Sequence, residues 1–345
     1  MRKSQLILAL LLSLLSSGLV LQAQRKKVVL TGTERHGWAT SESALRDFRE
    51  AAEGANFIVA KSEEEFNREI VDADGIVGEI TRDQFLTAKN LRWMQEYSAG
   101  VEDYGYPEFR DSSVLLTNCK IVQGPTIADH AFGMLLALTR GLNRFISNRA
   151  KEEWNRDNTG MVELQGRTAL VIGVGGIGSQ IAQRAHGFGM TVIGVDPKDI
   201  APGNILSEVV HPGQLDRVLP LADVIFVSAP HTPESEHMVG PRQFDLMKQD
   251  AYFIAVSRGK LYETPALVKA LDSRKLAGAG LDVTDPEPLP KGHPLWKFPN
   301  VIITPHVASQ SPESNARRIA VIKENLRRFV AGEPPLNVVN KQLGY

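Results

Sequence analysis

The chain has 345 residues, enough for two domains that each bury a core of their own. Its 39 Lys and Arg residues nearly balance its 40 Asp and Glu residues, so no overall field favours nucleic acid as a partner. The single cysteine, Cys119, excludes an internal disulfide and a multi-cysteine metal site, and we predict no metal. Its apolar neighbours indicate a buried, unreactive thiol.

Residues 1–23 have the layout of a secretory signal peptide. Arg2 and Lys3 precede an apolar run from Leu6 to Val20, and the small residue Ala23 follows. The run is shorter than the roughly 20 apolar residues of a spanning helix, so no stable membrane anchor is expected. We therefore predict an exported protein, periplasmic or secreted. The alternative is a cytoplasmic protein with an N-terminal extension.

Strands and helices alternate in the first part of the folded chain. Ser62 is the expected N-cap of a surface helix, and Glu65 completes a capping box. This alternation is typical of an open parallel sheet with helices on both faces, so a first α/β domain is predicted. The predicted strands are 27–30, 57–60, 74–78 and 92–95, and the predicted helices are 43–53 and 62–70.

A loop of small residues, Ser98-Ala99-Gly100-Val101, follows the strand at 92–95. Ligands bind beyond the carboxyl ends of strands in such sheets, and small residues leave backbone N–H groups open to a carboxylate. The loop is therefore a candidate substrate-binding segment, and an ordinary turn is the alternative.

A long apolar helix is predicted from Thr126 to Asn143. Its apolar residues cover two stripes, so we expect it to be buried on more than one side and to link two domains. Asp129 and His130 lie within it. Polar contacts at a domain boundary are the expected role of this pair, rather than catalysis.

The segment from Thr168 to Asp196 combines a strand, a glycine-rich turn, a helix and a second strand. In the turn, Gly173 permits a tight bend, Gly175 lets the backbone approach a pyrophosphate, and Gly178 allows close packing of helix on strand. The unpaired N–H groups at the start of the helix suit a phosphate diester. The segment therefore predicts a dinucleotide site. Its expected contacts are Gly173, Gly175, Gly176, Ile177 and Gly178.

Asp196 ends the second strand of this segment, where its carboxylate can accept hydrogen bonds from both ribose hydroxyls. The same charge would repel a 2′-phosphate, so we expect NAD rather than NADP. Lys198, two residues later, weakens that preference without reversing it. The alternative is a glycine-rich turn in an ordinary α/β protein.

Four later strands, predicted at 223–228, 252–256, 277–281 and 301–304, each end in polar residues. Because the carboxyl ends of parallel strands share one edge, these residues are expected to meet beside the glycine turn.

Three residues near that edge have complementary chemistry. Arg258 can hold a carboxylate with two hydrogen bonds and polarise an adjacent carbonyl. His306 suits proton transfer near neutral pH, and Glu287 beside it would set its tautomer and favour the imidazolium. With NAD, this set suits hydride transfer between 2-hydroxy acids and 2-keto acids. The alternatives are a surface ion pair for Arg258, a structural cap for His306 and a solvated carboxylate for Glu287.

From about Lys27 to Asn340 the chain resembles the D-isomer-specific 2-hydroxyacid dehydrogenase family. The motifs that carry the resemblance are the glycine turn with Asp196, Ala229-Pro230-His231-Thr232-Pro233-Glu234, Ser257-Arg258-Gly259, Leu281-Asp282-Val283 with Glu287-Pro288, and Pro305-His306. The resemblance implies that Arg258, Glu287 and His306 are catalytic. The implied cofactor contacts are Thr126, Ser228, Pro230, Val256 and Asp282, and the implied substrate contacts are Gly78, Ser98, Ala99, Gly100 and Arg258.

The resemblance also implies two doubly wound α/β domains and a homodimer. A Rossmann NAD-binding domain at 125–308 would be inserted in a flavodoxin-like substrate domain formed by 27–124 and 309–345. The leading hypothesis is an NAD-dependent oxidoreductase that interconverts small 2-keto acids and D-2-hydroxy acids, similar to glyoxylate and hydroxypyruvate reductases. The alternative is a non-catalytic NAD(H)-sensing or binding protein on the same fold. Export conflicts with the scarcity of free NAD outside the cytoplasm.

Overall fold

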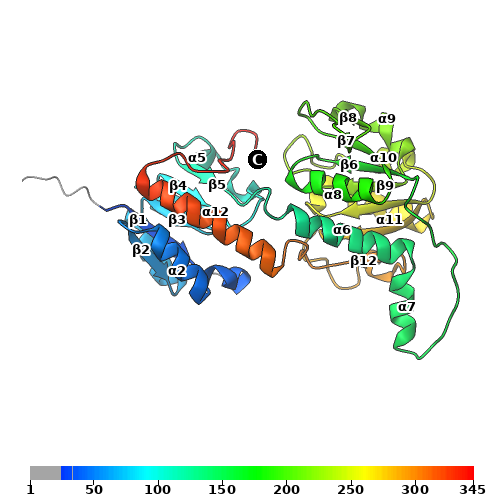
Figure 1. Cartoon of the computed structure of the whole chain (residues 1–345), viewed down its shortest axis with the longest axis horizontal. Helices are drawn as coiled ribbons and strands as arrows, with labels where there is room; N and C mark the ends of the chain where they lie inside the picture. The colour runs from blue at the N-terminus through cyan, green and yellow to red at the C-terminus, as the bar shows by residue number, and fades with distance from the viewer. Residues whose placement is uncertain (1–24, 33) are drawn as a thin grey trace, which may run out of the picture.

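The computed structural model describes residues 25–32 and 34–345, which form two parallel sheets covered by helices (Figure 1). The predicted signal peptide lies outside the described residues. Among the residues described, no helix combines the length and the apolar character of a membrane span.

The first sheet has five parallel strands in the order β2-β1-β3-β4-β5. The order reverses between β1 and β3, as in flavodoxin-like domains, and ligands bind beyond the strand ends at such a point. The expected flavodoxin-like sheet is confirmed. Its strands are β1 (Lys27–Thr31), β2 (Asn56–Ala60), β3 (Gly75–Val77), β4 (Trp93–Gln95) and β5 (Leu115–Thr117).

Short helices connect these strands. Ser62 caps α3 as expected, because its hydroxyl accepts the Glu65 N–H, but the Glu65 carboxylate binds the N–H of Lys61 and not that of Ser62. Only half of the predicted capping box forms. The helices are α2 (Glu42–Ala51), α3 (Glu63–Glu69), α4 (Arg82–Thr87) and α5 (Pro107–Arg110), with 3-10 turns at η1 (Glu34–Thr40), η2 (Ile70–Asp72) and η3 (Glu102–Tyr104).

The second sheet has seven parallel strands in the order β12-β11-β10-β9-β6-β7-β8. Chain order reverses between β6 and β9, which is the Rossmann arrangement that the sequence predicted. β8 was not expected. The strands are β6 (Thr168–Ile172), β7 (Thr191–Val195), β8 (Glu208–Val210), β9 (Val224–Val227), β10 (Ala251–Ala255), β11 (Leu276–Leu281) and β12 (Val301–Ile303).

Helices cover both faces of the second sheet, with buried aliphatic and aromatic side chains on each side. They are α6 (Gly124–Thr139), α8 (Gly176–Gly187), α9 (Leu215–Val218), α10 (Pro241–Leu246) and α11 (Thr264–Asp272), and the 3-10 turns are η4 (Pro212–Gln214), η5 (Leu219–Leu221), η6 (Gly259–Leu261) and η7 (Pro294–Lys297).

The single long helix predicted at 126–143 is wrong in its bounds. The structure has α6 (Gly124–Thr139) and a second helix, α7 (Leu142–Arg149), separated at Gly141. Gly141 adopts a left-handed conformation with φ of 66°, which ends the first helix. The segment after α7 projects from the body of the domain (Figure 1).

The polar pair on α6 makes structural contacts, as expected. Arg184 Nε donates to Asp129 at 2.7 Å, and His130 Nε2 lies 2.9 Å from Thr304 Oγ1. These bonds tie α6 to α8 and to the end of β12. The expected burial of Cys119 is also confirmed, and burial raises the pKa of its thiol to about 12.

The chain crosses back to the first sheet at its end. α12 (Pro312–Ala331) packs on α2, and the tail after it joins β5 through a bond from Val339 N–H to Leu116 O of 2.9 Å. The carboxyl edges of the two sheets therefore face the same space.

Candidate active site

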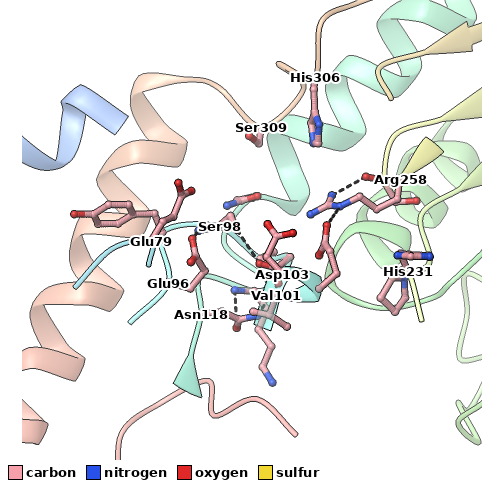
Figure 2. Close-up of a pocket in the computed structure, with 18 of the residues that line it drawn as sticks. Glu79, Glu96, Ser98, Val101, Asp103, Asn118, His231, Arg258, His306 and Ser309 are labelled. Carbon is pink, nitrogen blue, oxygen red and sulfur yellow. Dashed lines mark hydrogen bonds and ion pairs between the residues drawn. The ribbon is translucent and has the colours of Figure 1, made fainter. Parts of the chain in front are cut away.

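One cavity of about 1380 Å³ lies between the carboxyl edges of the two sheets. Figure 2 shows Arg258 and His306 on one side of this cavity and Ser98, Asp103 and Asn118 on the other. The expected convergence of strand ends is therefore present. The predicted site residues that line the cavity are Gly175, Gly176, Ile177, Ser228, Pro230, Val256, Asp282, Ser98, Ala99, Gly100, Arg258, Glu287 and His306.

The glycine turn is built by close backbone contacts. Gly173 has a φ of 87°, and a Cβ there would lie 2.5 Å from the backbone N of Ala229. A Cβ on Gly178 would lie 1.8 Å from Gly173 O, so helix α8 could not start where it does. Ser228 Oγ donates to the same Gly173 O at 2.8 Å. Gly173 and Gly178 thus shape the turn from behind, while other glycines face the cavity.

The residues present fit a dinucleotide. Nothing lies within 4 Å of the place where a Cβ would stand on Gly175, so the turn leaves open space at the start of α8. The first N–H groups of a helix have no partner within it and carry the positive end of its dipole. A pyrophosphate at Gly175, Gly176 and Ile177 would satisfy both conditions.

Asp196 follows β7 beside this turn. Its carboxylate accepts the N–H of Val174 and of Lys198, each at 2.9 Å. These bonds hold the carboxylate in place, and each carboxylate oxygen keeps a further lone pair for a ribose hydroxyl. Thr126, another predicted cofactor contact, does not line the cavity. It lies at the junction of α6 and α12, where its hydroxyl is 3.3 Å from Ser311 Oγ.

His306 and Glu287 form a hydrogen-bonded pair, with His306 Nδ1 2.7 Å from Glu287 Oε1. Burial raises the pKa of Glu287, but the hydrogen bond and charge of His306 outweigh it and hold that pKa below its usual value. The carboxylate is therefore ionised at neutral pH. His306 has a φ of 53°, an uncommon conformation for a residue with a side chain, and such conformations concentrate at functional sites.

Asp282 holds the loop that carries His306. Its side chain is 1% exposed, and its oxygens accept the N–H groups of Val307 and Ala308, each at 3.0 Å. Thr304 Oγ1 donates to the same carboxylate at 2.6 Å. A buried carboxylate with this many donors is well satisfied, so Asp282 fixes the backbone directly after His306 and the Thr304 side chain before it.

Arg258 reaches the cavity from the end of β10. Its Nη1 donates to Ser257 O at 2.7 Å, and its Nε donates to Glu102 at the start of η3, beyond the end of β4. A Cβ on the next residue, Gly259, would lie 2.1 Å from the carbonyl of Thr284. The glycine therefore lets the Arg258 segment pack against the loop that leads to Glu287.

The loop after β4 faces these residues. Among the described residues, the N–H groups of Ala99 and Gly100 have no acceptor, so both can bind a carboxylate. The N–H groups of Gly78 and Ser98 already donate, to Gln95 O and to Glu96. Gly78, with a φ of 122°, directly follows β3 and does not line the cavity.

Sequence reasoning missed several cavity residues. Glu102 carries the bond to Arg258, Arg318 is buried at the cavity wall, and Tyr345 stacks its ring 4.7 Å from Lys198 Nζ. Of these residues, only Glu102 could have been found from the sequence, because it directly follows the predicted substrate-binding loop. Within the described chain, no group of three or more His, Cys, Asp or Glu side chains could hold a metal ion.

Comparison with known proteins gives a consistent result. Residues 132–308 match the family described as D-isomer specific 2-hydroxyacid dehydrogenase, NAD binding domain. The glyoxylate reductase of Korarchaeum cryptofilum is 34% identical over 79% of this chain and 85% of its own length. The D-3-phosphoglycerate dehydrogenase of Methanocaldococcus jannaschii is 31% identical over 87% of this chain but only 57% of its own length.

A solved structure agrees with these sequences. The D-lactate dehydrogenase of Aquifex aeolicus, complexed with NAD and lactic acid, superposes with a TM-score of 0.75 and 26% identity, over 91% of this chain and 99% of that one. The family is established by two findings. The chain is 34% identical to a glyoxylate reductase along most of the length of that relative, and the family match covers half of the chain. This protein belongs to the D-isomer specific 2-hydroxyacid dehydrogenases.

Proposed function

We propose that the protein is an NAD-dependent oxidoreductase that interconverts small 2-keto acids and D-2-hydroxy acids, as glyoxylate and hydroxypyruvate reductases do. One observation carries the proposal. The His306–Glu287 pair, at 2.7 Å, and the Arg258 guanidinium line the same cavity as the glycine turn. A proton donor, a carboxylate-binding group and a dinucleotide site are the parts that this reaction needs.

NAD(H), when bound, supplies or accepts the hydride. The protein would do the rest. Arg258 would bind the substrate carboxylate and polarise the adjacent carbonyl, with the N–H groups of Ala99 and Gly100 on the other side of the acid. His306 Nδ1 is held by Glu287, so Nε2 is the ring nitrogen that would exchange a proton with the substrate oxygen. In reduction His306 donates this proton, and in oxidation it accepts it.

The test is the loss of NADH absorbance with purified residues 24–345 and a panel of glyoxylate, hydroxypyruvate, pyruvate and 2-ketoisocaproate. We expect turnover with NADH, less with NADPH, and loss of turnover in His306→Ala. Tight NADH binding without turnover of any acid would instead favour the NAD(H)-sensing protein. Binding of neither nucleotide would contradict the dinucleotide site itself.

We propose that residues 27–124 and 309–345 form the substrate domain and residues 125–308 the NAD-binding domain. The packing of α12 on α2 and the bond between Val339 and Leu116 support the return of the chain to the first domain.

We also propose a homodimer. Leu142 and Ile146 on α7 are 46% and 63% exposed, and Trp154 after it is 88% exposed. Clustered exposed apolar side chains of this kind mark interaction surfaces.

Light scattering on a sizing column tests the dimer. We expect a dimer for the wild type and a shift toward monomer for Ile146→Asp, since a carboxylate would be buried in the contact. A monomeric wild type would contradict the proposal.

We propose export through the N-terminal signal. Cell fractionation with N-terminal sequencing tests it, with Gln24 expected as the first residue of the exported form. An intact N-terminus in the cytoplasm would overturn it.

A further inference from the structure

We propose that Glu102 is a positioning residue that aligns the Arg258 guanidinium for the substrate carboxylate. The inference rests on the proposed function, because it requires Arg258 to bind the carboxylate of a 2-keto acid. It assigns a part in substrate binding to an acidic residue on the side of the cavity opposite Arg258.

The two residues come from opposite sides of the cavity. Glu102 begins η3, directly after the loop that follows β4, and Arg258 follows β10. They are 156 positions apart in the chain, and their ion pair spans the cleft between the two sheets. This ion pair therefore links the two sides of the cavity.

The contacts fix the plane of the guanidinium. Nε donates to Glu102 Oε1, and Nη1 donates to Ser257 O at 2.7 Å. With two nitrogens held, the third, Nη2, lies over Gly100, where a Cβ would stand only 1.8 Å away. Nη2 is thereby placed beside the loop whose Ala99 and Gly100 N–H groups have no acceptor among the described residues. A carboxylate in that position would receive donors from both sides of the cleft.

The surroundings keep the pair charged and ordered. The side chains of Glu102 and Arg258 are 31% and 28% exposed. Burial raises the pKa of Glu102, but the charge and the hydrogen bond of Arg258 outweigh it and hold that pKa below its usual value. A free arginine side chain would lose rotamer freedom on binding substrate, and Glu102 removes most of that loss beforehand.

A second interpretation makes the opposite prediction. If Glu102 competed with the substrate for Arg258, its removal would tighten substrate binding. The structure argues against competition, because Glu102 takes Nε and leaves Nη2 directed at the substrate loop. The sign of the change in KM therefore separates positioning from competition.

The experiment compares the full chain with Glu102→Ala, Glu102→Gln and a control, Asp111→Asn. Asp111 is an exposed carboxylate of the same domain that pairs with Arg110 away from the cleft. For Glu102→Ala we expect KM for the keto acid to rise about 10-fold, the scale of one hydrogen bond to a charged group, with kcat changed less and KM for NADH unchanged. Glu102→Gln, which keeps an acceptor, should lose less. Asp111→Asn should match the wild type.

Chemical rescue of Arg258→Ala distinguishes positioning by Glu102 from a purely structural role, because a structural role would not change the activity that added guanidinium restores. Guanidinium added to Arg258→Ala should restore part of the activity when Glu102 is present and much less in Arg258→Ala with Glu102→Ala. A lower or unchanged KM in the Glu102 variants, or equal rescue in both backgrounds, would overturn the positioning role.

Binding of oxamate, an unreactive analogue of a 2-keto acid, to the NADH complex measures the same contact without turnover. We expect weaker binding in Glu102→Ala by calorimetry. If the wild type binds NADH but neither binds oxamate nor reduces any keto acid, the proposed function fails, and so does the positioning role of Glu102. If the wild type does both and the Glu102 variants equal it, only the Glu102 proposal fails.

Discussion

The two edges that face the cavity are built in different ways. On the second sheet, Arg258 and His306 directly follow parallel strands, and Glu287 lies in the loop after the strand between them. On the first sheet, the loop after β4 depends on side chains that pair within it and across the cleft. Glu96 accepts the hydroxyl of Tyr104 at 2.6 Å, and Glu102 binds Arg258.

This difference separates what topology positions from what individual contacts position. A strand end is placed by the sheet, so its side chain stays near the site when one neighbour changes. The loop is held by a buried carboxylate, Glu96, which is 2% exposed. Changes to His306 and Glu287 on the second sheet should therefore affect the chemical step, and changes in the loop of the first sheet should affect substrate binding and stability.

The largest expected effect is on the second sheet, for His306→Ala. Loss of a general acid and base typically lowers the rate by about 100- to 10,000-fold. We expect kcat to fall within this range while the affinity for NADH, measured by fluorescence titration, stays near that of the wild type. Weakened NADH binding of similar size would show that His306 supports the fold of the site and not the reaction.

Glu287→Gln tests the partner of His306. Because the pKa of Glu287 lies below its usual value, its carboxylate is ionised at neutral pH and becomes protonated only as the pH falls through that lowered pKa. We expect keto acid reduction by Glu287→Gln to fall about 10- to 100-fold, the scale of a hydrogen bond to a charged group. The loss of wild-type activity that accompanies protonation of Glu287 at low pH should be absent from the pH profile of the variant. An unmoved pH–rate profile would rule out coupling between the two.

Asp196→Ala tests cofactor choice at the same edge. Removing the carboxylate takes away acceptors for the ribose hydroxyls and the repulsion of a 2′-phosphate. We expect KM for NADH to rise about 10-fold and the ratio of NADPH to NADH activity to increase. Asp199→Ala, an exposed acid three residues later, is the control and should leave both values unchanged. An unchanged ratio in Asp196→Ala would contradict the assignment.

Glu96→Gln should have the smallest effect on turnover and a clear effect on stability. Burial raises the pKa of Glu96, with the Tyr104 hydrogen bond acting against it. A carboxyl whose folded-state pKa is raised makes the protein less stable as the pH rises above the unfolded-state value. The Tm of the variant minus the Tm of the wild type should therefore increase as the pH is raised from 4 to 8, measured by thermal unfolding. A Tm difference that decreases with rising pH would contradict the role of Glu96 as a buried carboxyl.

The same contrast explains how much the sequence could predict. The glycine turn, Asp196 and the strand-end residues follow from local patterns, because strand and helix periodicity place them without reference to distant residues. The break at Gly141 was missed because apolar residues continue on both sides of it.

Glu102 was missed because its partner lies 156 residues away. Likewise, Glu65 binds Lys61 N–H and not Ser62 N–H, which is a choice between adjacent donors that no pattern encodes. Gly78 was expected to touch substrate, yet its N–H already donates to Gln95 O. Such features depend on tertiary contacts.

The most direct measurement is the chirality of the product formed from hydroxypyruvate with NADH. Arg258, the glycine turn and His306 line one cavity, and the chain belongs to the D-isomer specific 2-hydroxyacid dehydrogenases. The proposed function therefore predicts D-glycerate as the product, formed by the wild type and not by His306→Ala. Formation of L-glycerate, of a racemic mixture, or of no glycerate at all would contradict it.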